Sequence, residues 1–209
     1  MNVAKDSAAP HPRLSNEDRR EQIMQAASVV FAERGYAGGT TDAVAKQAGI
    51  SQAYVVRMFG SKEQLFVEVA KRAADRVAAG FRSAIAEFAG NETAHEKQAI
   101  LGKVYADLVA DRGILLVLMH LFTMGHDPTF GPNSRECFLR IYRLVRDDAG
   151  MGPGEATQFM AQGMLVNTLL AMRIPDVLDE QPDAAELFDY CTGAQTDGIL
   201  EMYWRPNGA

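Results

Sequence analysis

Apolar residues recur along most of this chain at intervals of three and four positions, the spacing that places them on one face of an α-helix. The pattern is longest in residues 62–88, where the apolar positions are Leu65, Phe66, Val69, Ala73, Val77, Phe81 and Ile85. Ala and Leu are frequent and runs of β-branched residues are few, which also favours helix over strand. The sequence therefore predicts an all-α fold of about nine helices.

Glycines, prolines and capping residues separate the predicted helices. The helices are expected at residues 15–35, 41–48, 52–59, 62–88, 92–110, 113–124, 134–149, 154–173 and 183–204. Serine stands at the start of three of them (Ser15, Ser51 and Ser61), where its hydroxyl oxygen can accept a hydrogen bond from an amide of the first turn. Boundaries of this kind are accurate to roughly two to four residues.

The chain divides into three parts, two of them helical. Residues 15–61 are expected to form a small head, and residues 62–209 a helical body. Residues 1–14, which contain two prolines, are expected to be a flexible N-terminal arm. Hydrophobic residues make up 47% of the 209 positions, so a sizeable core can be buried.

The segments 41–48 and 52–59 have the spacing of a helix-turn-helix motif. Ala48 is small enough to let the two helices approach, and Gly49 can adopt the positive φ of a tight turn. Ile50, Val55 and Phe59 would be buried against Val44, Phe31 and Ala27. The positions left to face a DNA groove are Gln52, Ala53, Tyr54, Arg57 and Met58.

These exposed positions carry chemistry that suits DNA. The hydroxyls of Thr40, Thr41 and Ser51, the amides at the helix starts and the charge of Lys62 can all meet phosphates. Gln52 and Arg57 can read base edges, and Tyr54 can touch a thymine methyl group or a phosphate. Structural roles remain open: the hydroxyls cap helices in any case, Lys62 can be a solvated charge, Arg57 can pair with an acid such as Asp42, and Tyr54 can pack on the head.

The distribution of charge weakens an objection to DNA binding. The net charge of −6 alone argues against a nucleic-acid partner. Residues 1–72, however, carry ten Lys and Arg against eight Asp and Glu, so the acidity belongs to the rest of the chain. A head with a local basic surface can still meet phosphates while an acidic body stays away from the duplex.

The head also resembles a known family. Residues 20–66, REQIMQAASVVFAERGYAGGTTDAVAKQAGISQAYVVRMFGSKEQLF, are similar without gaps to the DNA-binding region of the tetracycline-repressor (TetR) family. The matching features are Ala26-Ala27, Phe31, Gly35-Tyr36, Thr40-Thr41, Val44-Ala45, Ala48-Gly49-Ile50-Ser51, Phe59, Ser61-Lys62-Glu63 and Leu65. The resemblance implies a homodimer whose two heads meet successive major grooves of a palindromic operator, and a body whose ligand changes the spacing of the heads.

Carried over by position, the resemblance makes Thr41, Ser51 and Lys62 backbone contacts, and Gln52 and Arg57 contacts of the recognition helix. The sequence departs from the family at two positions. Val56 and Met58 stand where an aromatic residue and a histidine are frequent, and the helix has its tyrosine two places earlier, at Tyr54. The contacts of individual residues with the operator therefore stay open.

Apolar, sulfur-containing and a few polar residues in the predicted body indicate a small-molecule cavity. Methionine adapts to irregular cavities, and a few polar groups among apolar ones are typical of ligand sites. The candidate ligand-binding residues are Phe81, Tyr105, Met119, His120, Phe122, Thr123, Met124, Phe138, Tyr142, Met164 and Asn167. The alternative is that these side chains only fill the core. The expected effector is small and largely apolar, and its identity is open.

The last two predicted helices are the candidates for dimerisation. Their apolar residues can close a four-helix bundle around a two-fold axis, or be buried within one subunit. The first carries Met160, Met164, Leu165, Thr168, Leu169 and Met172, and the second carries Leu187, Phe188, Cys191, Ala194, Ile199 and Leu200.

Several other classes of function lack a signal in the sequence. There is no serine-hydrolase elbow, no phosphate-binding glycine loop and no HExxH motif, so no catalytic residue, enzyme activity or cofactor is expected. His120 and His126, six residues apart, fall on different helix faces, and no metal is expected. Cys137 and Cys191 fit buried small residues of a reduced, cytoplasmic protein. No apolar run reaches membrane-spanning length, so no membrane partner is expected.

The sequence thus predicts a dimeric one-component transcriptional regulator, a repressor released from its operator by an apolar ligand. Two alternatives remain at this point. One is a dimeric DNA-binding regulator without a small-molecule ligand, and the other is a helical interaction protein with a degenerate head. Activation in place of repression, the operator sequence and the regulated genes are not given by the residues.

Overall fold

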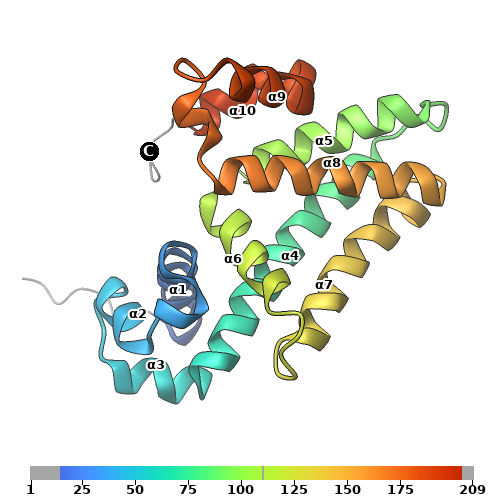
Figure 1. Cartoon of the computed structure of the whole chain (residues 1–209). Coiled ribbons are helices and arrows are strands. Elements are labelled where there is room, and N and C mark those ends of the chain that lie inside the picture. The colour runs from blue at the N-terminus through green and yellow to red at the C-terminus, as the bar shows by residue number, and fades with distance from the viewer. Residues whose placement is uncertain (1–14, 110, 204–209) are drawn as a thin grey trace, which may run out of the picture.

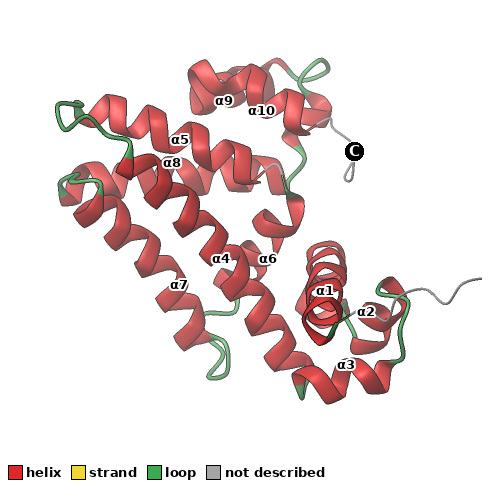
Figure 2. Ribbon diagram, turned by 180° about the vertical axis from the view of Figure 1, so that it is seen from behind, coloured by secondary structure: helices red, strands yellow, loops and turns green. Residues whose placement is uncertain are grey.

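The computed structural model describes residues 15–109 and 111–203, and these residues form helices and connecting loops without a β-strand (Figure 2). The predicted all-α fold is confirmed. The α-helices are α1 (Asn16–Gly38), α2 (Thr41–Gln47), α3 (Gln52–Phe59), α4 (Lys62–Ala86), α5 (Ala94–Val109), α6 (Arg112–Thr123), α7 (Gly131–Arg143), α8 (Pro153–Ala171), α9 (Pro182–Thr192) and α10 (Thr196–Tyr203). The predicted N-terminal arm, residues 1–14, lies outside the described residues.

Helices α1, α2 and α3 form the head at one end of the molecule (Figure 1). Each begins at a capping side chain, as the sequence predicts. Ser15 and Asp18 form a reciprocal capping box at the start of α1, and the hydroxyls of Thr40 and Ser51 accept first-turn amides in α2 and α3. These caps satisfy amides that have no partner within their own helix, which defines where each helix starts.

Helix α4 joins the head to the body. It starts beside α3 and runs between α6 and α7 toward the far end of the molecule, where α5 and α8 lie (Figure 1). One continuous core includes Phe31 of α1, Phe66 and Phe81 of α4, and Leu121 of α6, all of them fully buried. A second, smaller core lies under α9 and α10, around Phe188 and Leu169. The head and the body therefore share one core.

The structure differs from the predicted helices mainly at turns. The expected ninth helix, residues 183–204, is divided at Gly193, whose φ is 53°, into α9, a 3₁₀ turn (Gly193–Gln195) and α10. Glycine adopts this conformation at little cost, so the chain can turn there and lay α10 back on α5. Helix α5 begins two residues later than expected because the carboxylate of Glu92 accepts the amides of Ala89 and Gly90 in the preceding turn.

Candidate DNA-binding face and ligand cavity

The turn between α2 and α3 has the geometry expected of a helix-turn-helix motif. Gly49 has a φ of 64°, and the next amide, that of Ile50, donates to the carbonyl oxygen of Ala45 at 3.0 Å. Ala48 is buried where the helices approach, and Val55 is fully buried on the inner face of α3. Burying this side of α3 leaves the opposite side to the solvent.

The outer side of α3 carries polar side chains that are already oriented. Gln52 and Arg57 are exposed. The Gln52 amide nitrogen donates to the Thr41 hydroxyl oxygen at 2.9 Å, and the Arg57 guanidinium carbon lies 4.7 Å from the centre of the Tyr54 ring. Asp42, which the sequence offered as a possible partner of Arg57, forms an ion pair with Lys46 at 2.9 Å. In this arrangement Arg57 stacks on Tyr54 on the exposed side of α3.

The capping hydroxyls retain a donor. Thr40 accepts from the amide of Ala43 at 3.0 Å, and Ser51 accepts from the amide of Tyr54 at 3.3 Å. A hydroxyl can accept and donate at the same time. Each hydroxyl can thus cap its helix and still donate to a phosphate oxygen. Ala53, the remaining candidate on this face, is exposed.

Lys62 is held in place at the start of α4. Its ammonium nitrogen lies 4.3 Å from the centre of the Tyr36 ring and donates to the carbonyl oxygen of Ala37 at 3.4 Å. Tyr36 donates to Glu63 at 2.7 Å; burial, together with this carboxylate, raises the pKa of Tyr36 to about 12, and the same bond lowers the pKa of Glu63. A positioned ammonium group loses less side-chain entropy when it meets a phosphate.

A small apolar cavity of about 50 Å³ lies in the body between α4, α5, α6, α7 and α8. Below we call it the inner cavity. Its lining is Val77, Phe81, Tyr105, Leu118, Phe122, Phe138, Ile141, Phe159, Met160, Gly163, Met164 and Asn167. Tyr105 donates to the side-chain oxygen of Asn167 at 2.8 Å, and burial raises the pKa of Tyr105 to about 12. The phenol therefore stays neutral at physiological pH, and this polar pair stands in an otherwise apolar lining.

Six of the eleven candidate ligand-binding residues line the inner cavity, and five do not. Those in the lining are Phe81, Tyr105, Phe122, Phe138, Met164 and Asn167. Those outside it are Met119, His120, Thr123, Met124 and Tyr142. In α6 the cavity receives Leu118 and Phe122, four positions apart, so Met119 and Thr123 point to the neighbouring faces of the helix.

The residues outside the inner cavity have other surroundings. The His120 ring packs on Gly35 of the head, where an added Cβ would lie 3.3 Å from the ring carbon Cε1. Met119 packs on the smaller core under α9 and α10, and Thr123 donates to the carbonyl oxygen of His120 at 2.9 Å. Met124 and Tyr142 pack at the edge of the main core. Helical spacing could have found two missed residues, since Val77 lies four positions before Phe81 and Ile141 three after Phe138.

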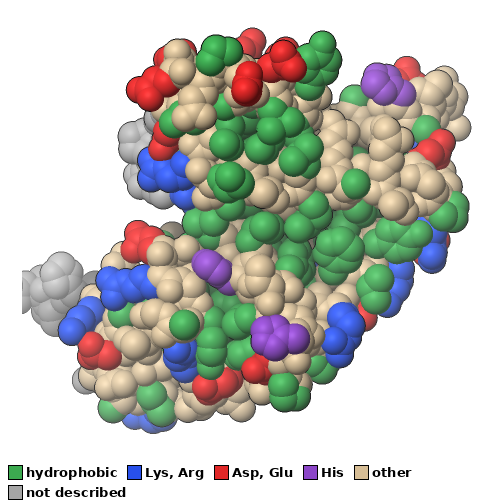
Figure 3. Space-filling view, viewed as in Figure 1, with side chains coloured by type: hydrophobic (Ala, Val, Ile, Leu, Met, Phe, Trp, Pro, Cys, Tyr) green, Lys and Arg blue, Asp and Glu red, His purple; other side chains and the backbone are tan. Residues whose placement is uncertain are grey.

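An exposed apolar face covers α8 and α9. Leu165, Met172, Leu187 and Tyr190 have 42%, 66%, 45% and 84% of their surface exposed. Figure 3 shows hydrophobic side chains gathered on the upper part of the molecule, where these helices face the viewer. Single exposed apolar residues are ordinary, but a contiguous group marks an interaction surface.

The described residues contain neither a cluster of metal-binding side chains nor a helix that could span a membrane. No group of three His, Cys, Asp or Glu side chains gathers within residues 15–109 and 111–203. Within the same ranges, no helix has the length and hydropathy needed to cross a bilayer. Cys137 and Cys191 are free thiols, and burial raises the pKa of both, which disfavours the reactive thiolate.

A helix-turn-helix head joined through a shared core to an all-helical body with a cavity defines a class of regulatory DNA-binding protein. Comparison with known proteins agrees. Residues 23–69 match the sequence model of the family described as "Bacterial regulatory proteins, tetR family". The resemblance of the head to the DNA-binding region of the TetR family is therefore confirmed over residues 23–69.

Curated relatives match the head region. The transcriptional activator FasR of Mycolicibacterium smegmatis is 38% identical over 73 residues, 35% of this chain and 33% of the relative. The transcriptional repressor AcnR of Corynebacterium diphtheriae is 36% identical over 70 residues, 32% of this chain and 37% of the relative. The chain thus spans about a third of the length of the curated relatives it matches.

Solved structures match almost the whole chain. A TetR-like transcriptional regulator from Rhodococcus sp. RHA1 aligns with a TM-score of 0.63 at 21% identity, covering 92% of this chain and 97% of that one. The regulator FadR from Bacillus subtilis, solved in complex with stearoyl-CoA, aligns with a TM-score of 0.63 at 20% identity, covering 88% and 97%. At these identities the likeness establishes the fold, including that of the body.

Proposed function

We propose that this protein is a one-component transcriptional repressor. As a homodimer it binds a palindromic operator, and it leaves the operator when a small, largely apolar molecule enters the inner cavity. The observation that carries the proposal is the outer side of α3, where Gln52 and Arg57 stand exposed on the second helix of a helix-turn-helix motif. Both side chains have the fork geometry that reads purine edges in the major groove.

Helix α6 supplies the connection from cavity to head. Its Leu118 and Phe122 line the inner cavity, while His120, between them in sequence, packs on Gly35 of α1. A ligand that displaces Phe122 therefore pushes on the helix that supports the head. The ligand can shift the equilibrium only by the difference between its affinities for the two positions of the head.

The dimer is proposed through α8 and α9. Their exposed apolar residues are the four named above, and covering them with the same face of a second copy would remove them from water. Two helices from each subunit would then form a four-helix bundle around a two-fold axis. This arrangement presents two heads to half-sites about one helical turn apart.

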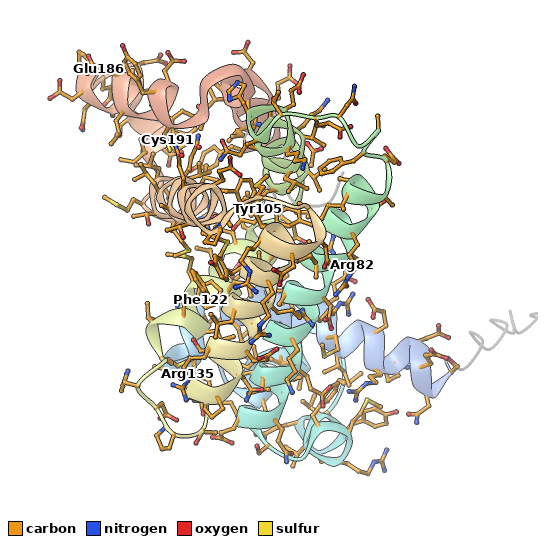
Figure 4. The ribbon with its side chains drawn as sticks, turned by 90° about the vertical axis from the view of Figure 1, so that its right-hand side faces the viewer. Arg82, Tyr105, Phe122, Arg135, Glu186 and Cys191 are labelled. Carbon is orange, nitrogen blue, oxygen red and sulfur yellow. The ribbon has the colours of Figure 1, made fainter. Side chains whose placement is uncertain are left out.

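Selection from a random duplex library tests DNA reading without any assumption about the operator. The native chain is expected to enrich a palindrome. Fluorescence anisotropy on the selected duplex then compares Arg57→Ala with Arg82→Ala, a control that removes the same charge from an exposed position of α4 in the body (Figure 4). We expect Arg57→Ala to weaken binding by about 5- to 150-fold, and Arg82→Ala by less than about twofold.

Other outcomes assign the protein to the alternatives. Enrichment of no sequence, with equal affinity for all duplexes, would favour an interaction protein with a degenerate head. Specific binding that no apolar compound weakens at matched salt would favour a regulator that senses no ligand. Equal losses in the two arginine variants would show that α3 does not read the bases.

A further inference from the structure

A second, larger cavity adjoins the inner one. This outer cavity, of about 240 Å³, lies between α5, α8 and the segment α9–α10. The two cavities share three lining residues, Tyr105, Phe159 and Gly163. Figure 4 shows Tyr105 between Cys191 of the outer cavity and Phe122 of the inner one. Only a thin wall of side chains therefore separates the two spaces.

The lining of the outer cavity combines apolar residues with several uncharged polar groups. Three glutamines, Gln98, Gln162 and Gln195, contribute amide groups, and His95 contributes an imidazole ring. Lys, Arg, Asp and Glu are absent from the described lining of both cavities. An anionic ligand would thus lose its hydration without gaining a lysine or arginine partner, which is costly.

The lining of the inner cavity contains a donor with a poor partner. Asn167 is only 3% exposed, and its side-chain oxygen already accepts from Tyr105. Its amide nitrogen faces the sulfur atom of Met164 at 3.8 Å. A thioether is a weak acceptor, and a buried amide donor gains when a carbonyl or hydroxyl oxygen replaces it. Asn167 is therefore equipped to receive an oxygen atom from a ligand.

The inner cavity is small and adaptable. An engineered cavity of about 150 Å³ accepts benzene, so a space of about 50 Å³ admits an alkyl chain only after side chains move. Met160 and Met164 line it, and their unbranched side chains change rotamer at low cost. Entry of a chain would also press on Phe122 of α6.

We propose that the two cavities are one ligand site, entered from the outer cavity past Tyr105, and that its ligand is an uncharged amphiphile. The apolar tail of the ligand occupies the inner cavity, an oxygen acceptor binds the amide of Asn167, and an uncharged polar end lies among the glutamines. The inference rests on the proposed function only in calling this ligand the effector. Its test uses the full chain without DNA, so failure here is distinguishable from failure to bind an operator.

Isothermal titration with three probes of one chain length tests the ligand class. The probes are methyl octanoate, octanoate and octanoyl-CoA at pH 7.5. We expect the neutral ester to bind at least tenfold more tightly than either anion, because the described lining offers them no lysine or arginine. Tighter binding of octanoate or octanoyl-CoA, or no binding of the ester, would overturn the proposed class.

Two glycines of α8 test the path. A Cβ at Gly163 would lie 3.7 Å from Tyr105, so a leucine there fits at its root and extends into the wall between the cavities, whereas a Cβ at Gly154 meets nothing within 4 Å. Gly163→Leu is expected to weaken ester binding at least tenfold, and Gly154→Leu less than twofold. Both replacements favour helix, and thermal unfolding confirms that the variants are folded. Unchanged ester binding in Gly163→Leu would refute the path.

The acceptor interaction is tested separately. Asn167→Leu, which keeps a branched side chain, removes the amide donor. It is expected to weaken the binding of methyl octanoate by roughly 2- to 10-fold, the contribution of about one hydrogen bond. Octanol and methyl octanoate should lose affinity alike in this variant because both present an oxygen acceptor. Ester binding equal to that of the native chain would exclude Asn167 as the ligand's partner.

Discussion

Phe130, in the connection between α6 and α7, joins the head to the body. It is 3% exposed, and its ring centre lies 4.7 Å from that of Tyr36 in α1 and 5.6 Å from that of Phe66 in α4, both in edge-to-face geometry. Phe130→Ala removes most of an aromatic side chain from a shared core and leaves a cavity. Such replacements cost about 3–5 kcal/mol, a range that includes the two ring pairs, each worth roughly 0.5–1.5 kcal/mol beyond area burial.

Urea denaturation followed by circular dichroism measures this loss. In a chain of 209 residues, a loss of about 3–5 kcal/mol corresponds to a melting temperature lower by roughly 6–20 °C. Leu139→Ala is the control in α7, because Leu139 is 43% exposed and its truncation should cost less than about 1 kcal/mol. A loss below about 1 kcal/mol for Phe130→Ala would refute the packed aromatic junction and, with it, this connection between body and head.

Three further predictions follow from other parts of the structure. Gly49→Ala should destabilise the head by about 1–2 kcal/mol, since alanine is strained at a φ of 64°, whereas Gly154→Ala in α8 should be neutral or stabilising; urea titrations of both variants compare them. Tyr190→Asp places a charge on the proposed dimer face and should yield monomers in analytical ultracentrifugation, whereas Leu139→Asp should sediment like the native chain. The raised pKa of Tyr105 means that the folded chain holds a proton that the unfolded chain releases above pH 10, so the free energy of unfolding should fall between pH 10 and 12. This fall should be smaller in Tyr105→Phe. An equal fall in both proteins would contradict the burial of the phenol.

The head was the most predictable part of the molecule. Its signals are local: a serine or threonine at each helix start, small residues where helices approach, and a glycine at the turn. Each acts over three or four residues, and the structure places the caps and the Gly49 turn where the sequence predicts them. The same short stretch carries the family resemblance, so the residues whose chemistry suits DNA are also those that resemble the TetR family.

The cavity was only half predictable, for a geometric reason. Chemistry selected the residues of α6 that looked suited to a ligand, and they fall on several faces of one helix. Which face meets the cavity depends on how α6 is rotated against its neighbours. The structure points Leu118 and Phe122 inward and sets His120 against Gly35, so an aliphatic residue lines the cavity and a histidine supports the head.

By itself, the sequence determined the all-helical class and the helix-turn-helix with its caps, because these depend on short-range periodicity and hydrogen bonding, and its motifs carried the family resemblance of the head. Only the tertiary structure decided that Arg57 stacks on Tyr54 while Asp42 pairs with Lys46. It alone divided the last predicted helix at Gly193 and brought Tyr105 of α5 to Asn167 of α8, 62 residues away, in the lining of the inner cavity. Contacts of this kind depend on the rotation and tilt of whole helices, which the packing of every buried side chain sets together.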